Sequence, residues 1–134
     1  AKAEDMRQKR EQVAEYYFES LKNIDEVQLP LNNSDRINSW HLFPIRLNLD
    51  KLIINRNEFI NKLKESGVGC SVHWRPLHLH PFYQNKYEFK QDFCPNASSL
   101  WLRLISLPIY SLLTIKELDF IVKQIKTICN KFKK

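Results

Sequence analysis

The stretch Cys70–Gln84 constrains the fold of this chain most strongly, because it combines two prolines with a high density of polar rings. Its sequence is CSVHWRPLHLHPFYQ, and it holds three of the four histidines together with a tryptophan and a tyrosine. Proline fixes φ and removes a backbone donor, so Pro76 and Pro81 predict that residues 75–82 form neither a helix nor a central strand. We expect a stiff surface loop that contacts a ligand, or alternatively a polar loop packed on aromatic side chains.

The rest of the chain shows the patterns of a small α+β domain. The order helix, strand, helix, strand, short helix, strand, helix predicts a small antiparallel or mixed sheet covered by helices. The expected elements are a helix over Ala3–Lys22, a strand over Ser39–Leu47, a helix over Asn55–Gly67, an extended segment over Val68–Trp74, a short helix opening at Cys94–Asn96, a strand over Ile105–Ile109 and a helix after Thr114.

Short signals refine several of these elements. Asn55 with Glu58, and Thr114 with Glu117, have the spacing of capping boxes. Pro44 lies near the middle of the first expected strand, which predicts an edge strand or a bulge there. Two further single-residue expectations are a left-handed Gly67 after the second helix and a core position for His41, which has apolar neighbours.

Length and composition limit the class of protein. Residues 1–134 are enough for one domain, and no apolar run is long enough to cross a bilayer. The net charge is +6, but the lysines are scattered and do not alternate with aromatic residues, so neither nucleic acid nor a membrane is expected as a partner. An odd number of cysteines (Cys70, Cys94 and Cys129) is typical of free thiols in a reducing cytoplasm.

The Cys70–Gln84 stretch also contains possible metal and nucleophile chemistry. Its good zinc ligands are Cys70, His73, His78 and His80, but their spacing is not that of a recognised closed site. Cys70 and His73 lack a third group that would orient the imidazole of a nucleophile and base pair. Two glycines in the whole chain cannot build a phosphate-binding loop. We therefore assign no metal ligand and no catalytic residue.

A longer run of residues resembles a known family. The run Arg56–Tyr83, RNEFINKLKESGVGCSVHWRPLHLHPFY, resembles the C-terminal segment of the DegT/DnrJ/EryC1/StrS family of pyridoxal-phosphate-dependent sugar aminotransferases. In that family a helix that starts with arginine ends in a glycine, and a His-aromatic pair precedes a Pro-Leu-His element and an aromatic residue. EYYFESL in the first helix and LPIY before the last helix resemble flanking family segments, so the resemblance covers essentially the whole chain.

The resemblance implies that the chain is the small C-terminal domain of a longer fold-type-I aminotransferase. The missing N-terminal large domain would carry the Schiff-base lysine, so pyridoxal phosphate is implied as cofactor of the full-length enzyme and not of this fragment. It further implies a homodimer and a nucleotide-linked keto-sugar substrate, with glutamate as amino donor, for surface polysaccharide or a related glycan. The isolated chain is expected to be inactive, and its role is to form part of the substrate pocket and of the domain and dimer interface.

The same resemblance assigns the substrate-binding residues. His73 and Trp74 correspond to the family's His-aromatic pair near the nucleotide-sugar, and His78 corresponds to the histidine of the Pro-Leu-His element. Tyr83 matches the aromatic residue that closes the loop, which either contacts the substrate or packs beneath it. Arg75 is added on chemical grounds, because a guanidinium fork binds a diphosphate with two parallel hydrogen bonds.

Two departures from the family pattern affect the expected sugar preference. Trp74 stands where a tyrosine is usual and so lacks a hydroxyl, and Ser111 stands where a proline is common.

Two other functions remain open at this point, a free-standing binding or regulatory module and a small metal-binding protein.

Overall fold

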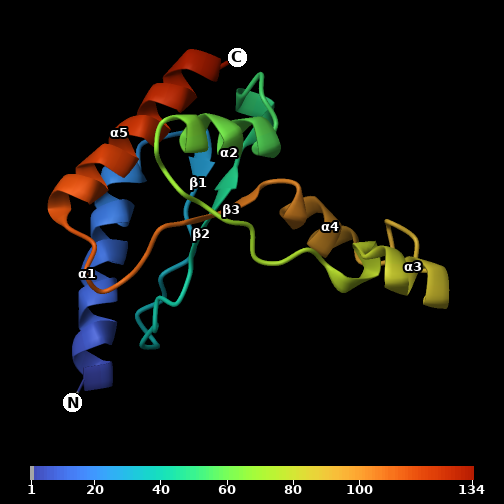
Figure 1. Ribbon diagram of the computed structural model, residues 1–134, viewed down its shortest axis with the longest axis horizontal. Helices are drawn as coiled ribbons and strands as arrows, with labels where there is room; N and C mark the ends of the chain where they lie inside the picture. The colour runs from blue at the N-terminus through green and yellow to red at the C-terminus, as the bar shows by residue number, and fades with distance from the viewer. Residues whose placement is uncertain (1) are drawn as a thin grey trace.

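The computed structural model describes residues 2–134 and shows a helical body with a projecting arm (Figure 1). Among these residues no helix is both long and apolar enough to cross a membrane. The elements are α1 (Lys2–Leu21), β1 (Val27–Gln28), β2 (Phe43–Leu47), the 3₁₀ helix η1 (Leu49–Lys51), α2 (Arg56–Glu65), the 3₁₀ helix η2 (Leu77–Leu79), α3 (Pro81–Tyr87), α4 (Pro95–Trp101), β3 (Leu104–Leu107) and α5 (Ile115–Phe132).

The body is an antiparallel three-stranded sheet covered by helices, as the sequence predicts. The strand order is β1-β2-β3, and α1 and α5 run side by side against the sheet while α2 packs on β3 and α5 (Figure 1). Fully buried side chains from these elements form one core, among them Tyr17, Phe43, Ile45, Leu47, Phe59, Leu63, Ile105 and Ile125. Alternation of buried and half-buried residues along β2 is the pattern of a strand with one face on a core.

The prediction that Pro44 marks an edge strand is wrong, because β2 is the central strand. The local reason for the proline nevertheless holds. The Asn48 N–H donates to the Glu26 carbonyl on the β1 side, and Pro44, four residues earlier, faces the same side by alternation. β1 pairs only with Leu47 and Arg46, so it ends before Pro44 and the missing donor breaks no ladder bond.

Both predicted capping boxes are confirmed. The Asn55 side chain accepts hydrogen bonds from the N–H groups of Asn57 and Glu58, and the Glu58 carboxylate accepts from the Asn55 N–H at 2.8 Å. Thr114 and Glu117 make the same reciprocal pair at the start of α5. These pairs satisfy donors that the first helical turn leaves free. Gly67 follows α2 with φ of 87°, the left-handed conformation expected there.

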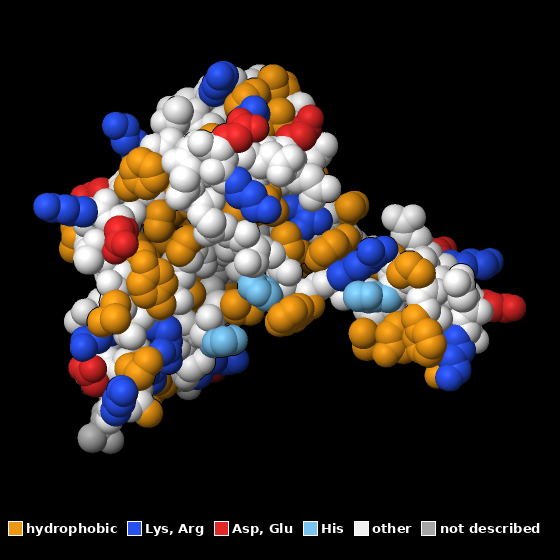
Figure 2. All heavy atoms as spheres, viewed as in Figure 1, with side chains coloured by type: hydrophobic (Ala, Val, Ile, Leu, Met, Phe, Trp, Pro, Cys, Tyr) orange, Lys and Arg blue, Asp and Glu red, His pale blue; other side chains and the backbone are white. Residues whose placement is uncertain are grey.

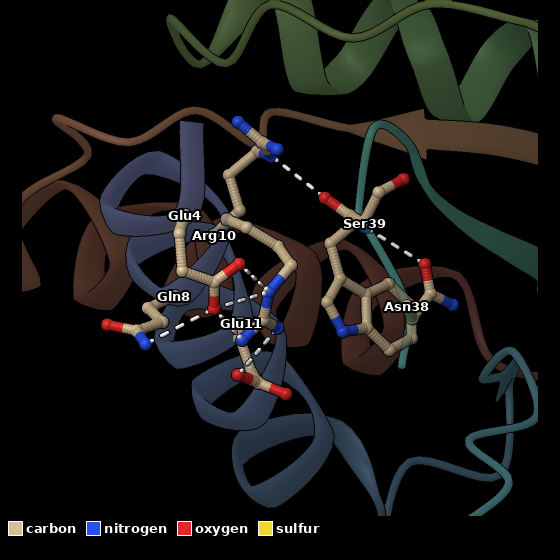
Figure 3. A network of polar contacts seen from close by, with 8 residues as sticks. Glu4, Gln8, Arg10, Glu11, Asn38 and Ser39 are labelled. Atoms are coloured by element: carbon tan, nitrogen blue, oxygen red, sulfur yellow. Dashed lines mark hydrogen bonds and ion pairs between the residues drawn. The ribbon is translucent and has the colours of Figure 1, made fainter. Parts of the chain in front are cut away.

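The loop before β2 is fastened to α1 (Figure 3). Arg10 Nε donates to the Ser39 carbonyl at 2.9 Å, and the buried Trp40 ring packs on Phe43 with centroids 5.6 Å apart. The expectation of a core position for His41 is wrong, since its side chain is exposed. Trp40, with a left-handed φ of 46°, takes the core position instead.

Residues 75–103, which we call the arm, leave the body between α2 and β3 and contain η2, α3 and α4 (Figure 1). The prediction of a non-helical loop over residues 75–82 is wrong, because η2 lies within it and α3 begins at Pro81. Pro76 is the residue before η2 and Pro81 is the first residue of α3. At the start of a helix the N–H that proline lacks has no intrahelical partner, so both prolines begin helical turns.

The extended segment over Val68–Trp74 forms no regular strand. One isolated antiparallel bridge pairs Ser71 with Ser106 of β3, with N–H to carbonyl distances of 3.2 and 2.7 Å. This bridge is sufficient to lay the segment along β3. It thereby sets the position of His73 and Trp74, the last two residues before the arm.

Candidate functional site

His73 and Trp74 lie where the chain passes from the sheet into the arm. His73 Nδ1 is 2.9 Å from the Ser106 hydroxyl, and the His73 ring meets the Trp74 ring edge-on with centroids 4.7 Å apart. Trp74 is 77% exposed, whereas the His73 ring is half-buried. Among residues 2–134 the structure gives His73 Nε2 no hydrogen-bond partner. An imidazole nitrogen and an open indole face are therefore presented together at the root of the arm.

Arg75 closes the turn around η2. One guanidinium nitrogen donates to the Leu79 carbonyl at 2.7 Å, and His80 Nε2 is 3.2 Å from the Arg75 carbonyl. A carbonyl only accepts, so His80 carries its proton on Nε2. Arg75 is exposed and spends one of its five N–H donors in this contact, so the remaining donors are available to an anion.

His78 is inside the arm, with 5% of its surface exposed. Its Nε2 lies 2.8 Å from the Ser98 hydroxyl, which donates to the Gln91 carbonyl at 2.7 Å. Because Ser98 has a single proton and gives it to Gln91, it can only accept from His78, and His78 Nε2 must carry a hydrogen. His78 thus fastens η2 to α4, and its polar contacts in the structure are internal to the arm.

Tyr83 begins a row of aromatic rings along the arm. Tyr83 stacks on Tyr87 at 6.1 Å, Tyr87 on Phe89 at 5.6 Å and Phe89 on Phe93 at 4.3 Å. Much of this row is at the surface, since Tyr87 is 51% exposed and Phe93 59%. Figure 2 shows hydrophobic side chains gathered on the arm. These rings pack against one another at the surface of the arm and not in an enclosed core, so the arm has an exposed apolar aromatic face.

The five predicted residues therefore fall into two groups. His73 and Trp74 touch each other at the root, whereas Arg75, His78 and Tyr83 have their contacts within the arm. A cavity of about 230 Å³ between η2 and α4 is lined by Arg75, Leu79, Gln84, Gln91, Ser98, Trp101 and Leu102. Arg75 is the single predicted site residue that lines it.

A larger cavity of about 510 Å³ lies between α1, β1 and α5, away from the arm. Most of its charged lining is paired: Lys133 Nζ is 2.9 Å from the Glu26 carboxylate, and Asp25 and Glu19 pair with Lys51 and Lys22, whereas Lys126 has no ion-pair partner within residues 2–134. These contacts hold the pKa of Glu26 and of Asp25 below the ordinary range, chiefly through hydrogen bonds from Lys133 and Lys51. The paired charges of this cavity link the segment before β1 to η1 and to the end of α5.

The described residues do not form a metal site. Within residues 2–134 no group of three His, Cys, Asp or Glu side chains is placed to hold a metal ion, so the zinc alternative loses its geometric basis. Burial raises the pKa of the Cys70 thiol, which disfavours the thiolate that a metal requires.

The sequence interpretation missed the residues that hold the site. Ser106 is 4% exposed in an otherwise apolar strand, and a lone polar residue among Ile105 and Leu107 is the signal that could have identified it. Arg56 is equally buried, and its guanidinium lies 4.5 Å above the Trp101 ring and 3.4 Å from the Leu104 carbonyl. Burial lowers the pKa of Arg56, and nothing in the local sequence marked that residue as an anchor of the arm.

The fold is that of sugar aminotransferases. Over 96% of this chain and 32% of theirs, it matches the apo-form of the putative sugar aminotransferase Spr1654 from Streptococcus pneumoniae, with a TM-score of 0.85 and 24% identity. Helicobacter pylori PseC, described as an aminotransferase involved in the biosynthesis of pseudoaminic acid, matches over 95% of this chain and 33% of its own, with a TM-score of 0.85 and 22% identity. Spr1654 is also known in a PLP-form, which matches 94% of this chain and 32% of its own with a TM-score of 0.84 and 26% identity.

The chain belongs to the DegT/DnrJ/EryC1/StrS aminotransferase family, whose model matches residues 1–126. It is 42% identical to the uncharacterized protein MJ1066 of Methanocaldococcus jannaschii over 95% of this chain and 33% of that protein. It is 32% identical to the spore coat polysaccharide biosynthesis protein SpsC of Bacillus subtilis over 93% of this chain and 32% of that protein. The chain thus spans about a third of the length of these relatives.

Proposed function

We propose that this chain is the C-terminal domain of a cytoplasmic aminotransferase that moves an amino group, donated by glutamate, onto a nucleotide-linked keto-sugar. The observation that carries the proposal is the pairing of His73 with the exposed Trp74 at the root of the arm, in a chain of a sugar aminotransferase family. The names of SpsC and PseC, which refer to polysaccharide and to pseudoaminic acid, support a sugar substrate. Three free cysteines favour a reducing compartment.

Each predicted residue has a role in this proposal. His73 binds a polar atom of the sugar-nucleotide through Nε2, and the Trp74 indole provides a flat apolar wall for a ring. Arg75 binds the diphosphate with its unused donors. His78 and Tyr83 complete the pocket wall, His78 by fixing η2 against α4 and Tyr83 by starting the aromatic row.

The remainder of the enzyme would supply the chemistry. Pyridoxal phosphate stabilises the carbanion that forms when an amino group is moved, and protein groups position it and the substrate. The cofactor and its lysine would belong to an N-terminal large domain, and the active enzyme would be a homodimer. The family match supports this division.

The test is a transamination assay on the full-length protein, with a panel of nucleotide-linked keto-sugars and glutamate. We expect turnover, and we expect His73→Ala and Trp74→Ala to raise the KM for the sugar roughly tenfold, while the KM for glutamate is unchanged. His41→Ala, at an exposed histidine outside the arm, is the matched control and keeps wild-type constants. Normal sugar KM values in both arm-root variants would remove this site from the proposal.

The size of the native polypeptide tests the domain assignment separately. An antibody against this chain should detect, on a denaturing gel of the source cells, a band well over twice 16.1 kDa. A band near the mass of this chain would contradict the proposal and favour a binding module that acts alone.

A further inference from the structure

The Ser106 hydroxyl forms a hydrogen bond with His73. Ser106 is 4% exposed, and its backbone N–H and carbonyl are both used in the bridge to Ser71. Its hydroxyl lies 2.9 Å from His73 Nδ1, and among residues 2–134 the structure gives this hydroxyl no other partner. The contact joins the middle of β3 to the root of the arm.

Proton accounting then fixes the state of the His73 ring. A buried hydroxyl proton without an acceptor is unfavourable, and His73 Nδ1 is the acceptor at hand. Ser106 therefore donates to Nδ1, which must carry a lone pair. The neutral imidazole then has its hydrogen on Nε2, the nitrogen without a partner in the described chain.

The other two histidines of the Cys70–Gln84 stretch differ in this respect. His78 spends its Nε2–H on Ser98, and His80 spends its Nε2–H on the Arg75 carbonyl. Among these three histidines, only His73 presents a donor that the described chain leaves unused. Its neighbour Trp74 is 77% exposed, so a ligand can reach this position.

We infer that Ser106 is a positioning residue that holds His73 as the Nε2–H tautomer, so that His73 donates a hydrogen bond to an oxygen acceptor of the sugar-nucleotide. The acceptor class is a carbonyl, hydroxyl or phosphate oxygen. The inference rests on the proposed function, because it requires that His73 faces the substrate. Without Ser106 the ring can rotate or change tautomer, and the donor is no longer aimed.

Five variants of the full-length enzyme test this, with the nucleotide-linked keto-sugar that the enzyme turns over: three at Ser106, His73→Ala and the double variant. We expect Ser106→Ala to raise the KM for that sugar roughly tenfold, with the KM for glutamate unchanged. Ser106→Thr keeps the hydroxyl and should restore a wild-type KM, whereas Ser106→Val has nearly the same shape without the hydroxyl and should behave like Ser106→Ala. In a His73→Ala background, Ser106→Ala should add no further change, because both act on one contact.

The outcomes separate this inference from the function beneath it. A wild-type sugar KM in Ser106→Ala, combined with a raised KM in His73→Ala, overturns the positioning role and leaves the proposed site intact. A wild-type sugar KM in His73→Ala, or no turnover of any nucleotide-linked keto-sugar, overturns both. Ser106→Thr and Ser106→Val could instead raise the KM values for the sugar and for glutamate equally, or Ser106→Ala and His73→Ala could have additive effects on the sugar KM. Either result would mean that Ser106 only stabilises β3 and does not position His73.

Discussion

Tyr16 and Tyr17 show how burial changes the contribution of a tyrosine hydroxyl to the stability of the fold. The Tyr17 hydroxyl donates to the Pro108 carbonyl at 2.8 Å, and its ring is fully buried against Phe43. Burial raises the pKa of Tyr17 above its ordinary value near 10. The adjacent Tyr16 hydroxyl binds the Asp119 carboxylate at the surface. Tyr17 therefore joins α1 to the segment after β3 in a dry environment, whereas Tyr16 has water as an alternative partner.

We expect Tyr17→Phe to lower the free energy of unfolding by about 1–2 kcal/mol, because it leaves the Pro108 carbonyl without this donor. Tyr16→Phe makes the same chemical change at the surface and should stay within about 0.5 kcal/mol of wild type. Urea denaturation of the 134-residue chain measures both. Equal losses in the two variants would contradict the dependence on burial.

Candidate site residues could be selected from the sequence, but their roles in binding stay predictions. The His-aromatic pair was selected through its resemblance to the family motif and the neighbouring arginine through its chemistry, and they lie at the root and first turn of the arm. Which histidine has a free nitrogen depends on Ser98 and Ser106, which lie 20 and 33 residues from their partners. No local pattern reports a contact at that separation, so the division of labour among the histidines required the structure.

At the scale of elements, signals confined to one helical turn were the most reliable. Both capping boxes were predicted because all partners lie within four residues. The prediction for residues 75–82 was wrong because proline breaks a helix only when it lies in the helix interior. Pro76 and Pro81 instead lie at the starts of η2 and α3, where proline is favourable. The central position of β2 was missed because Pro44 indicates an edge, and the proline is tolerated only because β1 ends before it, which no residue of β2 indicates.

The capping box of α5 gives a prediction with a pH dependence. Thr114→Ala should destabilise the 134-residue chain by about 1 kcal/mol at pH 7, as measured by urea denaturation. Hydrogen bonds from the Thr114 hydroxyl and N–H hold the pKa of Glu117 below its ordinary 4.5. A lowered pKa in the folded state stabilises the fold above the ordinary value, and this contribution is lost as pH falls through the lowered one.

The difference between wild type and Thr114→Ala should therefore narrow when the denaturation is repeated at pH 3. Thr127→Ala, at an exposed position inside the same helix, is the control and should be neutral or slightly stabilising. A constant difference between pH 7 and pH 3 would mean that Glu117 takes no part in the cap.

The contact of Arg56 with Trp101 gives a prediction about the arm as an element. The guanidinium of α2 lies 4.5 Å above the ring at the end of α4, so the contact holds the arm to the body. Trp101→Ala should raise the rate of tryptic cleavage at Lys86 and Lys90 about fivefold, equivalent to about 1 kcal/mol of lost anchoring. Trp74→Ala, at a tryptophan that is 77% exposed, should leave this rate unchanged. Equal rates in wild type and Trp101→Ala would exclude the anchoring role.

At the scale of the whole molecule, the arm is the part whose apolar surface the body does not cover. The core of α1, α2, α5 and the sheet is closed, whereas the arm projects away from it (Figure 1). Hydrophobic side chains gather on the arm (Figure 2), where the rings of Tyr83, Tyr87, Phe89 and Phe93 stack in a row. Contiguous exposed apolar side chains mark interaction surfaces. The chain spans about a third of the length of its relatives, so we expect the rest of such a protein to pack on the aromatic row of the arm.

The isolated chain should therefore associate with itself through the arm. Sedimentation of the 134-residue chain at increasing concentration should show dimers or larger species, because the exposed rings of Phe82 and Phe93 have no other cover. Replacing both by serine should shift the chain toward monomer. The same pair of changes at Leu112 and Ile115, exposed apolar residues near the start of α5, is the control and should leave association unchanged. A chain that stays monomeric at all concentrations would mean that the arm is stable in water without a partner.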